Sequence, residues 1–336
     1  MARGPVVSVL LPARDAAGTL PAALASLRRQ TLRSWECVLV DDGSRDATGR
    51  IARAAACADP RIVVLHTPRV GIVAALSVGL DRCRGRYVAR MDADDLMRRD
   101  RLAQQVRALD CDATLAAVGA HVRIFPRRGL TAGLRDYERW LNGIASPDGV
   151  RREAFVECPI VHPTLCARSE VLRSASYRDA GWPEDYDLVL RWLAAGHRIG
   201  VVARRLLCWR DHPARLSRTH PRYARAQLTA LKAQALAAGL LAAHDRYILW
   251  GYGGTGRALR RALHAHGKQP SHVIELHPGR LGNRIHGAPV VPPQALRALP
   301  RQPLVASVAG AAARTAIRRY LNALGWIETR DYVCAA

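Results

Sequence analysis

The chain has 336 residues, of which 49% are hydrophobic, and its 51 lysines and arginines against 28 acidic residues give a formal net charge of +23. This composition excludes an intrinsically disordered chain, and no apolar run approaches the roughly 20 residues of a membrane-spanning helix. The charge favours anionic partners. We do not expect nucleic acid among them, because all but two of the basic residues are arginines spread along the chain, and aromatic residues for base stacking are few.

Eight cysteines are scattered without any CxxC pair, which is typical of reduced thiols in a cytoplasmic protein. The N-terminal residues, Met1 to Pro5, lead directly into a strand-like run and lack the form of a signal peptide. We therefore expect a cytoplasmic protein, whose basic surface allows loose peripheral contact with the inner face of the membrane.

Strand and helix patterns alternate through the first part of the chain. Short apolar runs predict buried strands at residues 6–11, 36–40, 62–65 and 87–91, and Pro12 is expected to stop the first of them. Helical spacing of apolar residues predicts the intervening helices, at residues 19–30, 47–58 and 73–81. This order implies an α/β fold with a mainly parallel sheet flanked by helices, in which ligands bind beyond the carboxyl ends of the strands.

Two acidic clusters follow predicted strands of this sheet. Asp41 and Asp42 come after the second strand, and Asp92, Asp94 and Asp95 come after the fourth. So much like charge is costly unless a cation or hydrogen-bond donors neutralise it. Hard oxygen ligands at this density suit Mg²⁺ or Mn²⁺ together with a nucleotide diphosphate. Taken alone, the first cluster is also typical of a turn with a helix cap, and the second of a solvated helix N-terminus.

The second part of the chain begins with an alanine- and leucine-rich stretch, residues 221–244, that predicts a connecting helix. After it the alternation resumes, with predicted strands at residues 247–250, 271–276, 289–291 and 303–308 and a helix at 257–266. We therefore expect one large domain at residues 1–220, the connecting helix at 221–244, and a small Rossmann-like α/β domain at 245–336.

Gly251, Gly253 and Gly256 form a GxGxxG pattern between the first strand and the helix of the last domain. Glu275 ends the next predicted strand, close to the ~20-residue offset of a ribose-binding acid. This context makes the four residues candidates for a second nucleotide site. It also raises an alternative function, an NAD(P)-dependent sugar-modifying oxidoreductase. The competing interpretation is a structural or partner-docking domain whose glycines serve tight packing.

A series of motifs runs in order through residues 5–220. The motifs are Pro12-Ala13-Arg14, Val40-Asp41-Asp42-Gly43-Ser44-Arg45-Asp46, Ala89-Arg90-Met91-Asp92-Ala93-Asp94-Asp95 with Asp100-Arg101-Leu102 and Gln105, Val161-His162-Pro163-Thr164 with Arg168, Trp182-Pro183-Glu184-Asp185-Tyr186-Asp187-Leu188-Val189-Leu190-Arg191, and Trp209-Arg210 with His212 and Ser217. This stretch resembles the family 2 glycosyltransferases. The resemblance implies an inverting enzyme of the GT-A fold that moves a sugar from a nucleotide-diphosphate sugar to a glycan or lipid-linked saccharide, in cell-envelope polysaccharide synthesis.

The resemblance also implies roles for individual residues. Asp94 and Asp92 would hold Mn²⁺ or Mg²⁺, which neutralises the leaving nucleotide diphosphate. Asp185 would be the general base that deprotonates the acceptor hydroxyl, with Glu184 as the alternative base or as a group that orients the acceptor. The residues implied in nucleotide-sugar binding are Pro12, Arg14, Asp41, Asp42, Arg90, Asp92 and His212.

Plainer interpretations stay open for several of these residues. Glu184, Asp185 and Asp187 also fit the first-turn charges of a helix. His162, which precedes a proline, is expected to be structural rather than catalytic. His212 is as typical of a surface histidine as of a phosphate contact.

Overall fold

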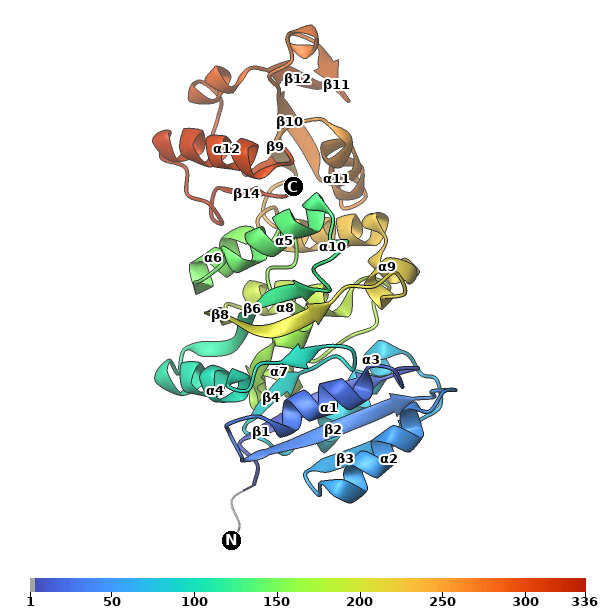
Figure 1. Ribbon diagram of the computed structural model, residues 1–336. Helices are drawn as coiled ribbons and strands as arrows, with labels where there is room; N and C mark the ends of the chain where they lie inside the picture. Colours follow the sequence, from blue (N-terminus) through green and yellow to red (C-terminus); the bar gives the residue numbers. More distant parts are fainter. Residues whose placement is uncertain (1–3) are drawn as a thin grey trace. The chain divides into compact units, whose positions relative to one another are not determined.

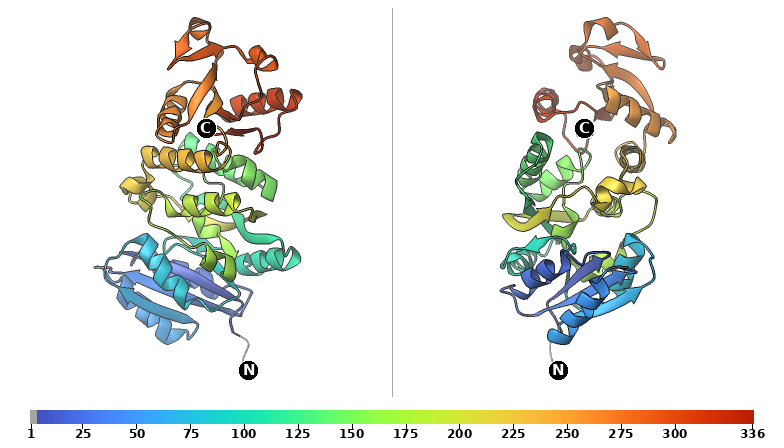
Figure 2. Two further views of the ribbon diagram at one scale, coloured as in Figure 1. Left: turned by 180° about the vertical axis from the view of Figure 1, so that it is seen from behind. Right: turned by 45° about the vertical axis from the view of Figure 1, so that its right-hand side comes forward.

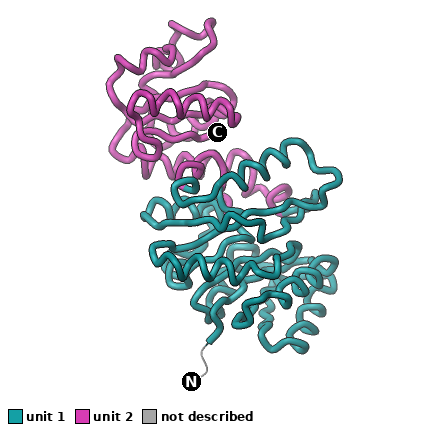
Figure 3. Tube along the Cα trace, turned by 60° about the vertical axis from the view of Figure 1, so that its left-hand side comes forward, with its two compact units in different colours: residues 1–150, 159–180, 184–215 teal, residues 151–158, 181–183, 216–336 magenta. Residues whose placement is uncertain are grey.

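The computed structural model describes residues 4–336 as a mixed α/β structure (Figure 1 and Figure 2). The α/β class expected from the alternating pattern is therefore confirmed. Residues 1–3, where a signal peptide would begin, lie outside the described residues. Two compact units make up the chain (Figure 3). Unit 1 consists of the residues up to 150 with 159–180 and 184–215, and unit 2 of residues 151–158, 181–183 and 216–336.

Four parallel strands form the first half of the sheet of unit 1, in the order β3-β2-β1-β4. The strands are β1 (Val7–Ala13), β2 (Trp35–Asp42), β3 (Ile62–Thr67) and β4 (Tyr87–Arg90). The helices between them are α1 (Leu20–Arg28), α2 (Thr48–Ala58) and α3 (Ile72–Arg82). The predicted alternation of strands and helices is confirmed for all of these elements.

The first strand runs on through Pro12, where the sequence pattern predicts its end. Pro12 and Ala13 pair with Val40 and Asp41 of β2. Strand β4 pairs with β1 only as far as Leu10, so beyond that residue β1 has a neighbour on one side only. A residue without an N–H group is tolerated at such an edge. The predicted stop at Pro12 is wrong for this reason.

The second half of the sheet is mixed in direction. It continues from β4 in the order β7-β6-β8-β5, in which β6 and β8 pair parallel and the other pairs are antiparallel. The strands are β5 (Leu96–Met97), β6 (Leu115–Phe125), β7 (Cys166–Arg168) and β8 (Arg198–Arg210). The helices are α4 (Arg101–Cys111), α5 (Ala132–Asn142), α6 (Pro147–Glu153, whose last residues belong to unit 2), the 3-10 turn η1 (His162–Thr164), α7 (Ser169–Ser174) and α8 (Glu184–Ala194).

Alternate residues of the central strands face opposite layers of helices. Val9 and Leu11 of β1 share a buried cluster with residues of α1, α2 and α4, and α1 crosses this face of the sheet in Figure 1. Leu10 faces α3, where a Cβ added at Gly79 would lie 2.4 Å from Leu10 Cδ1 and 2.8 Å from Val40 Cγ2. Helices thus cover both faces of the sheet, and a binding site is expected at the strand ends.

Unit 2 contains a second, mainly parallel sheet. Its order is β11-β12-β10-β9-β13-β14, and the edge pair β11-β12 is antiparallel. The strands are β9 (Arg246–Trp250), β10 (Gln269–Ile274), β11 (Arg284–Ile285), β12 (Ala288–Val291), β13 (Leu304–Ala306) and β14 (Tyr332–Cys334). The helices and 3-10 turns are α9 (Leu216–Thr219), η2 (Pro221–Tyr223), α10 (Arg225–Ala238), α11 (Gly254–His264), η3 (Pro278–Arg280), η4 (Pro293–Arg297) and α12 (Ala311–Ala323).

Helix α10 occupies the stretch in which the sequence predicts a connecting helix. Ala233 and Leu236 of α10 share a buried cluster with Leu259 and Leu263 of α11 and with Tyr247 of β9. This apolar contact makes α10 an integral part of the core of unit 2.

Candidate functional site

The two acidic clusters of the sequence lie at the carboxyl end of the parallel strands. Asp41 and Asp42 are the last two residues of β2, and the second cluster begins two residues after β4 ends at Arg90. Strand β1 lies between β2 and β4, so the clusters flank its end. Ligands bind at this edge in sheets of this kind.

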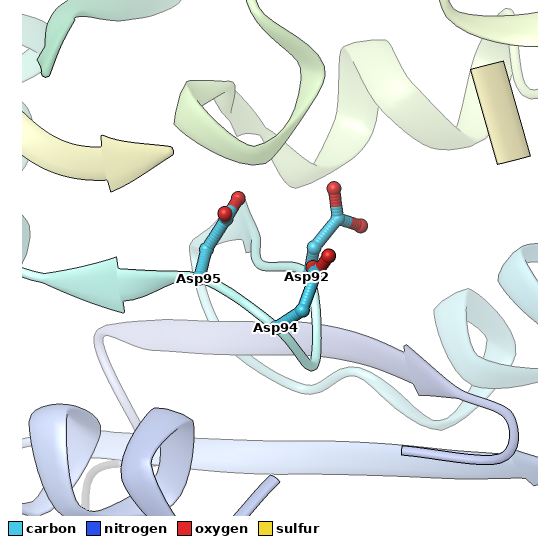
Figure 4. A group of neighbouring side chains, drawn as sticks. All are labelled: Asp92, Asp94 and Asp95. Atoms are coloured by element: carbon cyan, nitrogen blue, oxygen red, sulfur yellow. The ribbon is translucent and has the colours of Figure 1, made fainter. Parts of the chain in front are cut away.

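Asp92, Asp94 and Asp95 point to the same side of the loop that follows β4 (Figure 4). Each offers a carboxylate oxygen, and these oxygens lie within 4.8 Å of one another. Burial, and next the charge of Asp92, raise the pKa of both Asp94 and Asp95. Oδ2 of Asp95 is buried and has no hydrogen-bond partner among the described residues. A cation would stabilise such an oxygen, so the chemistry of the cluster fits Mg²⁺ or Mn²⁺.

Arg90, the last residue of β4, is buried next to this cluster. Its Nη2 lies 2.6 Å from Oδ1 of Asp92. Burial alone would lower the pKa of Arg90, but the charge and hydrogen bond of Asp92, together with the charges of Tyr177 and Glu184, outweigh burial and the pKa is raised. The charge of Glu184 acts in the same direction and links Arg90 electrostatically to the start of α8. Arg101, which is fully buried at the start of α4, donates from Nη2 to the carbonyl oxygen of Arg90 at 2.8 Å.

Residues at and just beyond the end of β8 form hydrogen bonds with the other two aspartates of the cluster. Arg210 donates its backbone N–H to Oδ1 of Asp95 and its Nε to the carbonyl oxygen of Asp94, each at 2.7 Å. Nε2 of His212 lies 3.0 Å from Oδ2 of Asp94. The structure therefore brings together four residues singled out from the sequence, namely Arg90, Asp92, Asp94 and His212.

Asp41 is buried, and both of its carboxylate oxygens have partners. Oδ1 accepts a hydrogen bond from the backbone N–H of Ser44 at 3.2 Å, and Oδ2 lies 3.1 Å from Nδ1 of His66. Nη1 of Arg53, on α2, lies 3.1 Å from the other ring nitrogen of His66, Nε2. The sequence motifs do not point to His66 or Arg53. The signal that finds His66 is the parallel register of β2 and β3, which places it opposite Asp41.

The loop after β3 donates hydrogen bonds to the carboxylate of Asp42. Its oxygens accept hydrogen bonds from the backbone N–H groups of Val70 at 2.7 Å and Gly71 at 3.1 Å. Oγ1 of Thr67 lies 3.4 Å from Oδ1. Gly71 has a φ of 88° and directly precedes α3. Asp42 thus fixes the entry into α3, and the ligand contact implied for it stays a prediction.

The loop after β1 is tied to the loop after β2. The backbone N–H of Asp15 donates to Oγ of Ser44 at 3.0 Å, and the N–H of Arg45 donates to Oδ1 of Asp15 at 2.8 Å. Asp15 has a φ of 46°, a conformation that aspartate and asparagine adopt more readily than other side chains. Arg14 is exposed beside it, with Nε 3.5 Å from Oδ2 of Asp15, while Pro12 is buried in β1.

The start of α8 carries both candidate bases. Glu184 is buried and Asp185 is partly exposed. Burial, and next the charge of Glu184, raise the pKa of Asp185 to about 7, and Arg90 acts in the opposite direction. A carboxylate whose pKa lies near neutrality is suited to accept a proton from a hydroxyl group.

Asp187, one turn into α8, has a different environment. It is fully buried, and Arg178 donates to it from Nε at 2.8 Å and from Nη2 at 2.7 Å. Arg191 donates from Nε at 2.7 Å. Two guanidinium groups on one carboxylate form strong, directional bonds, so Asp187 fixes the helix that carries Asp185.

His162 is buried beside a tyrosine that the sequence motifs do not single out. Nε2 of His162 lies 2.8 Å from the hydroxyl oxygen of Tyr177. Burial, and next the charge of Arg90, lower the pKa of His162, so the ring is neutral. Burial raises the pKa of Tyr177, the charge of Arg90 lowers it, and the charges of Glu184 and Asp185 raise it further. This geometry fits the structural role expected for His162, with Tyr177 next to the charged groups of the site.

The glycine pattern of unit 2 lies between β9 and α11, as the sequence predicts. Gly251 has a φ of 92°, and a Cβ added at Gly256 would lie 2.2 Å from the carbonyl oxygen of Gly251. Gly253 precedes α11 and has no atom within 4 Å of an added Cβ. Oε1 of Glu275 accepts a hydrogen bond from the backbone N–H of Tyr252 at 2.8 Å. Tight packing accounts for Gly251 and Gly256, and the second nucleotide site stays a prediction.

Comparison with known proteins gives consistent matches. The profile of "Glycosyl transferase family 2" matches residues 8–173. The chain is 31% identical over 204 residues to the putative glycosyltransferase EpsE of Bacillus subtilis, in an alignment that covers 59% of this chain and 70% of EpsE. It is 31% identical over 182 residues to the amylovoran biosynthesis glycosyltransferase AmsE of Erwinia amylovora, which covers 54% of this chain and 66% of AmsE.

Two solved structures resemble the fold. TarS residues 1–349 of S. aureus, in complex with UDP-GlcNAc, matches with a TM-score of 0.52 and 17% identity, over 77% of this chain and 72% of that chain. The mannosyltransferase PcManGT of Pyrobaculum calidifontis, in complex with GDP-Man and Mn²⁺, matches with a TM-score of 0.53 and 23% identity, over 79% of this chain and 70% of that chain. At these identities the likeness is one of fold.

Proposed function

Because this chain belongs to glycosyl transferase family 2, we propose that it moves a sugar from a nucleotide-diphosphate sugar, bound with a divalent metal ion, to a hydroxyl group of a glycan or lipid-linked saccharide. The chain is a glycosyltransferase, and the mixed sheet of unit 1 has the GT-A fold. The observation that carries the finer proposal is the cluster of Asp92, Asp94 and Asp95. Its ligand oxygens lie within 4.8 Å of one another, and one buried oxygen has no partner among the described residues.

Asp92 and Asp94 would hold the metal ion, with Asp95 as a third oxygen ligand. Manganese and magnesium both suit such an all-oxygen set. When bound, the ion neutralises charge on the leaving nucleotide diphosphate. Arg90 orients Asp92 across 2.6 Å, and His212 orients Asp94 across 3.0 Å. These contacts fix the carboxylates before the donor arrives.

Asp185 acts as the general base. It accepts the proton of the acceptor hydroxyl while that oxygen attacks the anomeric carbon, and the bond from this carbon to the diphosphate oxygen breaks on the opposite face. The configuration at the anomeric carbon is thereby inverted. A pKa of about 7 leaves Asp185 largely ionised just above neutrality and still basic enough to take the proton. Glu184 is the alternative base.

Related proteins support a nucleotide-sugar donor and a polysaccharide pathway. TarS was solved with UDP-GlcNAc and PcManGT with GDP-Man, and AmsE is named for amylovoran biosynthesis. We propose the same classes here, a nucleotide-diphosphate sugar as the donor and a cell-envelope saccharide as the acceptor. The nucleoside would lie against the ends of β1 and β2, toward Pro12, Arg14, Asp41 and Asp42.

A lipid-linked acceptor would bring the enzyme to a membrane surface. Among residues 4–336, no helix combines the length and the apolar character that crossing a bilayer requires. The net charge of +23 supports peripheral attraction to anionic lipid instead. The oxidoreductase alternative is not favoured, because the family match covers residues 8–173 and the similar proteins are named as glycosyltransferases.

A thermal-shift screen tests the donor and the metal together. The full chain is heated with UDP, GDP, CDP or ADP and with the corresponding nucleotide sugars, each with Mn²⁺ or with EDTA. We expect one nucleotide to raise the melting temperature in the presence of Mn²⁺, since a ligand at 100 times its Kd adds about 2.7 kcal/mol of stability. Stabilisation that is equal in EDTA would contradict the metal requirement, and no stabilisation by any nucleotide would contradict the donor.

A further inference from the structure

Asp41 is held by a histidine whose own ring is held by an arginine, and we propose that this pair positions the Asp41 carboxylate to recognise the base of the donor. Nδ1 of His66 lies 3.1 Å from Oδ2 of Asp41, and Nη1 of Arg53 lies 3.1 Å from Nε2 of His66. The inference rests on the proposed function, because it assigns a task within the nucleotide-sugar site. His66 and Arg53 are positioning residues, since they act through Asp41.

The hydrogen-bond chemistry fixes which nitrogen of His66 carries the proton. A guanidinium group only donates, so Nε2 of His66 must accept from Arg53. The ring is then the neutral form with its hydrogen on Nδ1, and it donates to Oδ2 of Asp41. Oδ1 accepts at the same time from the backbone N–H of Ser44 at 3.2 Å. The carboxylate cannot rotate without losing both bonds, so its remaining lone pairs have a fixed direction.

The surrounding backbone leaves room for this arrangement. A Cβ added at Gly49 would lie 2.7 Å from Oδ2 of Asp41 and 3.1 Å from Cε1 of His66, so a larger residue there would displace the pair. The side chain of Asp41 is 5% exposed, whereas that of His66 is 44% exposed. A hydrogen bond from such an exposed ring contributes little to folding stability. Its effect is therefore expected in the orientation of Asp41 rather than in the stability of unit 1.

A carboxylate of fixed direction selects among bases by their hydrogen-bonding pattern. Because a carboxylate only accepts, the base edge that it faces must present an N–H group. Uracil and guanine carry a ring N–H where cytosine and adenine carry a lone pair. A carboxylate that is free to turn can accept from the amino group of cytosine or adenine instead. The His66–Arg53 pair therefore increases both the affinity for the nucleotide and the discrimination between bases.

Two substitutions at one position test this directly. Asparagine places its amide nitrogen near the position of Nδ1 of histidine, whereas glutamine reaches toward the position of Nε2. We expect His66→Asn to keep the donor to Asp41 and to bind the preferred nucleoside diphosphate within about 3-fold of the unmodified protein, and His66→Gln to weaken binding about 10-fold. Calorimetry of the full chain with Mn²⁺ and UDP, CDP, GDP or ADP measures both effects.

The base ratio is the readout that a merely structural role would not change. In His66→Gln, the preference for UDP over CDP, or for GDP over ADP, should fall about 10-fold, while kcat at saturating donor stays within about 2-fold. Arg53→Met should act in the same direction with a smaller effect. Arg50→Met removes the same charge from an exposed position on the same helix and should leave binding unchanged. Melting temperatures of all variants show whether they fold.

Several outcomes would overturn the proposal. It fails if the unmodified protein prefers CDP or ADP, or if His66→Gln folds and keeps both the affinity and the base ratio. If His66→Gln does not fold, an unchanged base ratio in Arg53→Met overturns it instead. The absence of binding of every nucleotide to the unmodified protein would contradict the proposed function itself, which separates the two failures.

Discussion

Arg90 and Asp92 form a salt bridge of 2.6 Å in which the arginine side chain is 4% exposed and the aspartate side chain 32% exposed. The same arginine lowers the pKa of Asp185, the proposed base, against the effects of burial and of Glu184. One buried positive charge therefore acts on two functional groups at once. The acidic cluster proposed to hold the metal ion and the proposed base are electrostatically coupled through it.

The rate of transfer should fall as the pH drops below about 7, because Asp185 then carries a proton and no longer accepts one. Well below that pH the loss approaches about tenfold per pH unit. Arg90→Met removes a charge that favours ionised Asp185, so the acidic limb should move to higher pH. Measurements of kcat against pH at saturating donor check this for both proteins. An unmoved limb in Arg90→Met would contradict the coupling.

Asp185→Asn should abolish transfer while the donor still binds. Loss of a general base lowers kcat by about 10²–10⁴-fold, and the proposed nucleotide contacts lie on other elements. Glu184→Gln is the matched variant on the neighbouring residue and should retain more activity. Single-turnover transfer and nucleotide calorimetry on both variants separate chemistry from binding. The reverse order of activities would make Glu184 the base.

The same Asp185→Asn variant should be more stable than the unmodified protein at pH 8. The pKa of Asp185 is raised from 3.8 to about 7, so the folded protein favours the protonated form. The unmodified protein therefore loses stability as the pH rises from about 4 to about 7, and the loss is complete above that range. Asparagine cannot ionise and avoids this loss. The difference in melting temperature between variant and unmodified protein should grow from pH 5 to pH 8. Each kcal/mol of difference in the free energy of unfolding corresponds to about 2–4 °C.

Asp94→Asn should weaken Mn²⁺ binding by more than about 10-fold. Loss of a residue that only supports a metal ligand already lowers metal affinity by about 10-fold, and Asp94 is proposed as a ligand itself. The signal of free Mn²⁺ in electron paramagnetic resonance measures this without any assay of activity. EDTA should stop transfer by the unmodified protein, and added Mn²⁺ should restore it. The control is Asp136→Asn, an exposed carboxylate that pairs with Arg139 on α5. Equal Mn²⁺ affinity in Asp94→Asn and the control would remove Asp94 from the ligand set.

Asp187→Ala should destabilise unit 1 by about 1.5–3 kcal/mol, because it removes the fully buried carboxylate that accepts hydrogen bonds from two partly exposed guanidinium groups. Denaturant unfolding measures the change. Glu170→Gln, at an exposed position on α7, should have almost no effect. A variant that is as stable as the unmodified protein but inactive would show instead that Asp187 takes part in the chemistry.

The parallel half of the sheet could be predicted from the sequence because each of its strands is a short apolar run bounded by helices. The mixed half could not be predicted in this way. Strand β7 has three residues, too few for a pattern, and β8 alternates between buried and exposed segments along 13 residues. The predicted end of β1 is wrong because a proline is forbidden only where a neighbouring strand needs its N–H group.

The acidic side chains of the site could be predicted because their charge density stands out along the chain. Their partners could not. His66 on β3, Arg53 on α2 and Tyr177 in the loop between α7 and α8 reach the site from three separate segments, and ordinary sequence surrounds each of them. Asp41 and Asp42 are adjacent in sequence, yet one contacts the end of β3 and the other the loop beyond it. Such a division depends on the register of β2 against β3, which no local pattern specifies.

The hydrogen bonds between the loop after β1 and the segment after β2 also affect how a new donor preference could arise in this enzyme. Besides the bonds of Asp15, the backbone N–H of Ala16 donates to Oγ1 of Thr48 at 2.7 Å, and that of Ala17 to Oδ2 of Asp46 at 2.9 Å. Conformational entropy of both loops is thus lost on folding rather than on binding. A mutation in one loop alters the other, so a new donor preference would require coordinated substitutions in both. Engineering of this site should therefore exchange the two loops as a single block.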